Sequence, residues 1–214
     1  PLRLVGSEMC IRDSANIVLP YARPVETAAK KLMGLKLRIV APSHGVIWRS
    51  HFDRILAAYL DWRVSKPTRK VIILFSTMWQ STRHMAEAVA QGANESPVDV
   101  KLLDLAAVGD TEVITELMDC AAFAVGTPTL NQGLMPRVAA TLTYARGLKP
   151  AGKTAFAFGS YGWASKGPEE ATDYLRAMGC TLLRDPITCR FAPDAATLEA
   201  CREAGRALAK VVSD

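Results

Sequence analysis

The chain has 214 residues, 50% of them hydrophobic, and a formal net charge of +5 at pH 7. This length predicts one full domain plus a part of another. The basic excess lies wholly in residues 15–65, because residues 66–214 carry sixteen basic and sixteen acidic side chains. The main domain therefore has no excess of positive charge, and we expect no nucleic acid as a partner.

The first 14 residues differ in pattern from the rest of the chain. Residues 9–14 read Met-Cys-Ile-Arg-Asp-Ser, which resembles the translation of a transposase-based sequencing adaptor. No periodicity continues from this stretch into Ala15. We therefore expect residues 1–14 to be an artefactual leader, which is excluded from the fold, and we expect that a native N-terminal domain was lost at this junction.

The segment up to Pro67 carries the signals of two helices and one strand. Apolar spacing predicts helices over 16–33 and 51–63, and an apolar run predicts a strand over 36–41. Polar residues together with Pro67 predict a linker over 64–70. No apolar run in the chain reaches the roughly 18 residues of a membrane span, so we expect no membrane contact.

From the linker to the C-terminus, apolar runs rich in β-forming residues alternate with helical patterns. The predicted strands lie at about 70–75, 98–103, 121–126, 153–159 and 186–191, and the predicted helices at about 81–93, 111–118, 134–147, 167–178 and 195–212. This alternation predicts an α/β fold, a three-layer sandwich around a five-stranded parallel sheet.

The loop after the first of these strands, called here the first loop, combines hydroxyl side chains with a helix N-terminus. Its residues are Ser76, Thr77, Met78, Trp79, Gln80, Ser81 and Thr82. Free backbone N–H groups and the helix dipole favour an anion there, most often a phosphate. The loop has no Lys and no P-loop glycines, so it suits a singly phosphorylated ligand better than a triphosphate. Ser and Thr are also ordinary N-cap residues, and the loop alone leaves both interpretations open.

Two further loops come after the third and fourth predicted strands. The candidate ligand-binding residues of the second loop (127–133) are Thr127, Pro128, Thr129, Leu130, Asn131 and Gly133, and those of the third loop (160–167) are Ser160, Tyr161, Gly162, Trp163 and Ala164. In a sheet of order 2-1-3-4-5, strands 1, 3 and 4 are neighbours, so the three loops meet at the crevice where such sheets bind ligands, FMN among them. The rings of Tyr161 and Trp163 suit a planar ligand.

At these residues the chain resembles the flavodoxin-like domain of the flavodiiron proteins, also called A-type flavoproteins. The match covers roughly residues 15–212 and includes Thr77-Met78-Trp79, Thr127-Pro128-Thr129 and Gly159-Ser160-Tyr161-Gly162-Trp163. The resemblance implies a flavodoxin-like FMN-binding domain over 66–214. Gln80 departs from the family, which usually has Gly there. If this position requires a positive φ, Gln costs on the order of 1 kcal/mol and could weaken FMN binding.

Residues 15–65 resemble the C-terminal part of the metallo-β-lactamase-like domain that precedes the flavodoxin-like domain in this family. The resemblance implies that His44 ligates iron in the full-length parent protein. The chain has only three histidines and no His-x-Glu-x-Asp run, whereas a diiron centre needs several His and carboxylate ligands. We therefore expect no diiron centre in this fragment.

The resemblance also implies a function for the parent protein. FMN would take electrons from rubredoxin or a rubredoxin/NADH reductase and pass them to the diiron site of the other subunit in a head-to-tail homodimer. That site would reduce dioxygen or nitric oxide. Such a protein is cytoplasmic, which agrees with four cysteines after residue 14 that form no CxxC pair. We expect no catalytic side chain, because FMN carries the redox chemistry.

Two alternatives remain open at this stage. One is a free-standing flavodoxin-like electron carrier or an NAD(P)H:quinone reductase, in which residues 15–65 are incidental. The other is an interaction domain that has lost its cofactor, with Gln80 as the lesion. The colour of the purified protein, yellow or colourless, separates the second alternative from the flavin-binding ones.

Overall fold

The structure is a computed structural model that describes residues 17, 19–43, 46–64, 66–150 and 152–213. The expected leader, residues 1–14, and the candidate iron ligand His44 lie outside the described residues. The chain forms two compact units, and the boundary between them falls between Lys66 and Pro67.

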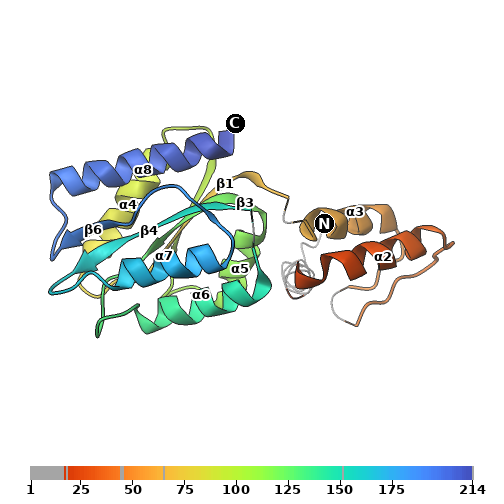
Figure 1. The fold of residues 1–214 in the computed structure, drawn as a ribbon. Coiled ribbons are helices and arrows are strands. Elements are labelled where there is room, and N and C mark those ends of the chain that lie inside the picture. Colours follow the sequence, from red (N-terminus) through yellow and green to blue (C-terminus); the bar gives the residue numbers. More distant parts are fainter. Residues whose placement is uncertain (1–16, 18, 44–45, 65, 151, 214) are drawn as a thin grey trace. The chain divides into compact units, whose positions relative to one another are not determined.

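The second unit is built on one parallel sheet (Figure 1). Its strands are β1 (Thr68–Phe75), β2 (Asp99–Asp104), β3 (Cys120–Gly126), β4 (Thr154–Tyr161), β5 (Thr181–Leu182) and β6 (Ile187–Arg190). The order is β2-β1-β3-β4-β5, with β6 also paired to β4. The predicted α/β fold with strand order 2-1-3-4-5 is therefore confirmed, and β1 begins two residues earlier than expected.

The fifth strand position differs from the sequence prediction of one continuous strand over 186–191. Two short strands occupy it, since β5 pairs with Thr154–Ala155 of β4 and β6 pairs with Phe158–Tyr161. Pro186 lies in the gap between β5 and β6. Proline has no N–H to donate to the ladder, which explains why the strand is interrupted at this edge of the sheet.

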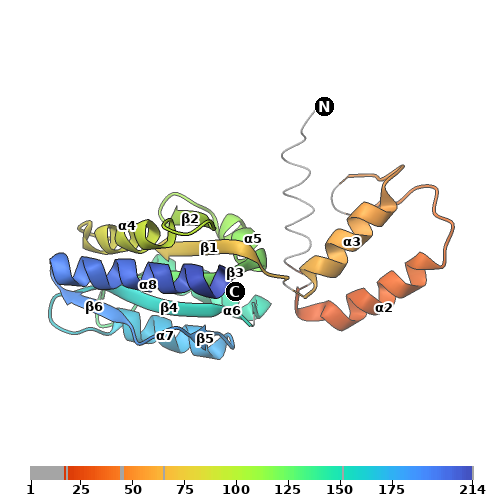
Figure 2. The same ribbon diagram turned by 90° about the horizontal axis from the view of Figure 1, so that it is seen from above.

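Helices cover both faces of the sheet (Figure 1, Figure 2). One face carries α4 (Ser81–Ala93) and α8 (Ala195–Ser213); the other carries α5 (Asp110–Asp119), α6 (Pro136–Leu148) and α7 (Gly167–Ala177). Alternate β1 residues enter two separate cores, Ile73 with α4 and α8, and Ile72 with α5 and α6. The continuous apolar run of β1 is thus explained by burial on both faces.

The described residues of the first unit form η1 (Leu19–Tyr21), α2 (Ala22–Met33) and α3 (Phe52–Trp62), and Figure 2 shows the long connection from α2 to α3. The predicted strand over 36–41 is wrong. Only an isolated antiparallel bridge forms, in which the backbone N–H groups of Val40 and Trp48 donate to each other's carbonyls at 2.9 and 2.8 Å. An apolar run without a neighbouring strand has no ladder to join.

The helices are short or carry charged faces. The longest helix in the described ranges is α8, and it contains Glu199, Arg202 and Arg206. Within those same ranges, no helix combines the length and apolar character needed to cross a membrane.

Candidate functional site

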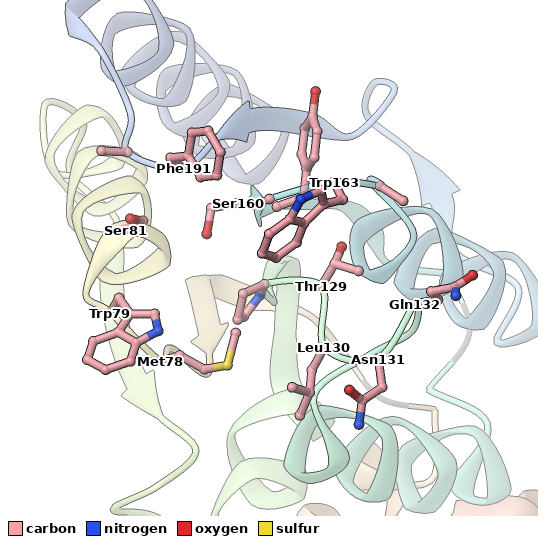
Figure 3. Close-up of a pocket in the computed structure, with 15 residues that line it drawn as sticks. Met78, Trp79, Ser81, Thr129, Leu130, Asn131, Gln132, Ser160, Trp163 and Phe191 are labelled. Carbon is pink, nitrogen blue, oxygen red and sulfur yellow. The ribbon is translucent and has the colours of Figure 1, made fainter.

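A cleft of about 740 Å³ lies at the carboxyl ends of β1, β3, β4 and β6 (Figure 3). It is lined by Met78, Trp79, Ser81, Pro128, Thr129, Leu130, Asn131, Gln132, Ser160, Tyr161, Gly162, Trp163, Ala164, Phe191 and Ala192. The volume suits a small-molecule ligand. No charged side chain is among these described lining residues.

The cleft brings together twelve of the eighteen candidate cofactor-binding residues, from all three loops. Six candidates are not part of its lining, namely Ser76, Thr77, Gln80, Thr82, Thr127 and Gly133. Sequence reasoning missed three lining residues, namely Gln132, Phe191 and Ala192. Contact of any of these residues with a ligand remains a prediction.

The first loop ends in the N-terminus of α4. Gln80 is the N-cap residue, with φ 69° and ψ −10°, and its side chain makes no capping hydrogen bond. The position that the family usually fills with Gly therefore does have a positive φ. The first N–H groups of a helix have no intrahelical acceptors. In α4 the side chain of the N-cap residue Gln80 does not accept a hydrogen bond from them either. These amides suit an anion.

The basic residue nearest this helix end already has partners. The Arg83 guanidinium forms an ion pair with Asp104 at 2.6 Å and lies 5.1 Å from the centroid of the Phe75 ring. An anion at the N-terminus of α4 would therefore be bound by amides and hydroxyls rather than by this charge.

Buried hydroxyls in the loops give a test of whether a phosphate fits. Among the described residues, three side-chain nitrogen or oxygen atoms are buried without a hydrogen-bond partner, and two of them, Thr77 Oγ1 and Ser165 Oγ, belong to the first and third loops. Leaving such a group unsatisfied costs about 1–3 kcal/mol. Thr77 precedes the N-terminus of α4 by four residues, so a phosphate oxygen there could accept its hydrogen bond. The residues present fit a phosphate group.

The second loop contains a tight two-residue turn. The backbone N–H groups of Leu130 and Gly133 donate to each other's carbonyls at 3.0 and 2.9 Å. Both central residues have a positive φ, 48° at Asn131 and 63° at Gln132, as in a type I′ turn. Gly133, a candidate ligand-binding residue, does not have a positive φ. A Cβ there would lie 3.0 Å from Glu170 Oε2.

The second and third loops are tied together by their backbones. The N–H of Thr127 donates to the Phe158 carbonyl at 2.9 Å, and that of Thr129 donates to the Ser160 carbonyl at 3.0 Å. Gly159 permits this approach, because a Cβ at that position would lie 1.8 Å from the Thr127 carbonyl oxygen. These hydrogen bonds therefore hold the second and third loops side by side along one edge of the cleft.

Aromatic side chains, among them Trp79, Trp163 and Phe191, line the cleft (Figure 3). Trp79 from the first loop is 88% exposed and Trp163 from the third loop is 92% exposed. Large apolar side chains gathered at one exposed site indicate a ligand or partner surface. Because aromatic rings stack on planar ligands, a planar aromatic ligand is the class that this lining favours.

Neither a metal cluster nor a reactive thiol accompanies the cleft in the described residues. No group of three or more His, Cys, Asp or Glu side chains there could hold a metal ion. Burial raises the pKa of the Cys189 thiol to about 11 and that of Cys201 to about 12. These thiols stay protonated at neutral pH and behave as apolar side chains.

The comparisons with known proteins agree with this geometry. The sequence model of the flavodoxin family matches residues 73–205. The chain belongs to the flavodoxin family. Membership supports FMN as the ligand of the cleft.

The flavodoxin domain has flavodiiron relatives, as the loop motifs predicted. The chain is 34% identical to the nitric oxide reductase of Moorella thermoacetica over 203 residues, which are 94% of this chain and 51% of that protein. The rubredoxin oxygen:oxidoreductase structure from Desulfovibrio gigas has a TM-score of 0.89 at 33% identity, covering 94% of this chain and 52% of the other. For the flavodiiron protein of Giardia intestinalis the TM-score is 0.87 at 29% identity, covering 94% and 51%. The chain thus spans about half the length of these relatives.

Proposed function

We propose that residues 66–214 bind FMN in the cleft and act as the electron-transfer domain of a flavodiiron oxygen or nitric oxide reductase. The observation that carries this proposal is the unpartnered buried hydroxyl of Thr77, four residues before the N-terminus of α4, in the same loop as the exposed indole of Trp79 in the cleft. The first loop therefore combines a hydroxyl that suits a phosphate with an aromatic side chain that suits a planar ring.

The first loop would hold the phosphate. Thr77 and Ser81 supply hydroxyl donors, and the first turn of α4 supplies backbone N–H groups and the positive end of the helix dipole. One helix terminus without a lysine suits the single phosphate of FMN. FAD would need a second phosphate site, and no GxGxxG follows a strand in this chain.

The second and third loops would hold the ring system. Trp163 and Tyr161 offer faces for stacking, and the rigid turn at Asn131 and Gln132 presents backbone groups at the edge of the cleft. Bound FMN supplies the redox chemistry. The protein binds the ring, orients it and excludes water, and no side chain is proposed to act as acid or base.

The remaining parts of the proposal rest on the relatives. A rubredoxin, or a rubredoxin/NADH reductase, would donate the electrons, as the name of the Desulfovibrio gigas relative suggests. Residues 15–65 would belong to a metallo-β-lactamase-like domain of the longer parent, with His44 as one ligand of its diiron centre. The acceptor iron would then lie in the partner subunit of a head-to-tail homodimer in the cytoplasm. The rest of the iron ligands would lie outside this fragment.

The test starts with the purified 214-residue chain. Flavin bound to it is released by heat and identified by chromatography, and dissociation constants are measured for FMN and for riboflavin, which lacks the phosphate. Thr77→Val should raise the dissociation constant of FMN by about tenfold or more and leave that of riboflavin unchanged, because a hydrogen bond to a charged group contributes about 1.5–3 kcal/mol. Thr143→Val, on the exposed side of α6, is the matched control.

The outcomes separate the candidate functions. A colourless chain with no affinity for FMN would refute the proposal and favour an interaction domain. Rapid quinone-dependent oxidation of NAD(P)H by the yellow chain would favour a free-standing reductase. Bound FMN without that activity supports the electron-transfer domain.

A further inference from the structure

Phe191 lines the cleft in a conformation that a bulky residue rarely adopts. It comes directly after β6, and its φ is 62°, in the left-handed region where phenylalanine is a genuine outlier. Its ring is 59% exposed although it is apolar. Strained backbone of this kind persists where the surrounding structure enforces it, and it gathers at binding sites.

The surrounding contacts that enforce this conformation come from β4 and the third loop. The Phe191 N–H donates to the Tyr161 carbonyl at 2.8 Å, and Arg190 Nε donates to the Gly162 carbonyl at 3.0 Å. The Arg190 guanidinium lies 5.0 Å from the centroid of the Phe191 ring. A Cβ on Gly162 would lie 3.6 Å from Phe191 Cε1, an ordinary contact distance, so the Phe191 ring lies beside Gly162 with room for a methyl group between them. Phe191 is therefore fixed relative to the loop that carries Trp163.

We infer that Phe191 is a cofactor-binding residue, whose side chain lines the cleft and contacts the ring system of bound FMN. This inference depends on the proposed function. In Figure 3 the Phe191 ring lies on the same side of the cleft as Ser81 and Ser160 and across from Leu130 and Asn131. A flavin ring in the cleft would cover the exposed face of Phe191 and would gain an aromatic contact there. The phosphate of FMN would form no favourable contact with this apolar side chain, because a phenyl ring has no hydrogen-bond donor.

Because the contact is with the ring, loss of the phenyl group should affect FMN and riboflavin alike. In the full chain, Phe191→Leu should raise the dissociation constants of both FMN and riboflavin about two- to tenfold, which is the range expected for one aromatic contact. Phe191→Tyr, which keeps the ring, should bind both ligands like the wild type. The visible absorption bands of the bound flavin should shift in Phe191→Leu and stay unchanged in Phe191→Tyr.

Two further variants separate the ring from the backbone and from general surface effects. Phe191→Gly removes the ring and also relieves the positive φ, so it should bind flavin as weakly as Phe191→Leu while being no less stable to heat. Tyr144→Leu removes another partly exposed aromatic ring of the same unit, on α6 outside the cleft, and should leave both dissociation constants unchanged.

Three results would overturn the inference while leaving FMN binding intact. They are wild-type affinity in Phe191→Leu, wild-type affinity in Phe191→Gly, or a loss confined to FMN with riboflavin unaffected. A wild-type chain that binds no flavin would overturn the inference and the proposed function together. Parallel weakening of both ligands in Phe191→Leu and Phe191→Gly, with rescue by Phe191→Tyr, supports it.

Discussion

Replacing Gln80 with Gly should stabilise the flavodoxin domain. Gln80 has a φ of 69° at the N-cap of α4, and its side chain makes no capping hydrogen bond that the change would remove. The left-handed conformation costs an ordinary residue about 1–2 kcal/mol. Glycine avoids this cost but gives the unfolded chain more freedom, which offsets about 0.4–1 kcal/mol. The free energy of unfolding should therefore rise by about 0.5–1 kcal/mol, which corresponds to about 1–4 °C in melting temperature.

The affinity for FMN should respond much less than the stability. If the first loop has the same backbone with and without ligand, the strain at Gln80 is present in both states and cancels in the dissociation constant. We therefore expect Gln80→Gly to bind FMN within about threefold of the wild type, a difference below 1 kcal/mol.

The assay is urea unfolding of the full chain without flavin, monitored by far-ultraviolet circular dichroism, together with FMN titration. Gln91→Gly is the comparison variant, because Gln91 is exposed in the last turn of α4, where glycine costs up to about 1 kcal/mol, and the change also removes the hydrogen bond that Gln91 Oε1 accepts from Arg202. The two variants should thus shift stability in opposite directions. Destabilisation by Gln80→Gly equal to that of Gln91→Gly would refute the strain argument.

Three other outcomes are expected. Trp163→Ala should weaken FMN about tenfold, at the upper end for one aromatic contact, whereas Trp48→Ala in the first unit should not change the dissociation constant. Gly159→Ala should destabilise the domain by about 3 kcal/mol, measured by urea unfolding, because its Cβ would lie 1.8 Å from the Thr127 carbonyl oxygen. Although burial raises the pKa of Glu116, its ion pairs with two lysines hold the pKa below the ordinary value. Glu116→Gln should therefore cost about 2 kcal/mol at pH 7, and the difference should shrink as pH falls below the ordinary carboxyl pKa of 4.5 and through the lowered pKa of Glu116. A constant difference from pH 7 to pH 3 would refute this account.

The sheet could be predicted from the sequence because its central strands are buried on both faces. Val71, Ile72, Ile73, Leu74 and Phe75 are each at most 1% exposed, so the pattern is a plain apolar run. The start of α4 was also predictable, since the hydroxyl residues of the first loop give way there to helical spacing. Apolar runs and periodicity are local properties of the sequence, and they predicted the elements and the α/β class, whereas the strand order 2-1-3-4-5 came with the resemblance to a flavodoxin-like domain.

Features that depend on distant partners were missed. The stretch over 36–41 contains the β-branched residues Ile39 and Val40, but no neighbouring strand in the described residues pairs with it. The break before β6 depends on Pro186 lying at a sheet edge, which local pattern does not reveal. Phe191 enters the cleft through a backbone conformation that its residue type disfavours. Gln132 has a positive φ in a turn that lacks the usual Asn-Gly pair.

The uncharged lining of the cleft has a consequence for kinetics. The described residues that line it include no acidic or basic side chain, and residues 66–214 have no net charge. With no charge in the lining and no net charge on residues 66–214, this domain by itself exerts little long-range attraction on an anion, so the association rate of FMN with it should be set by diffusion and orientation and should vary little with ionic strength. A protein partner that docks over the exposed indoles would likewise be recognised at contact, by shape and apolar surface, instead of being steered from a distance.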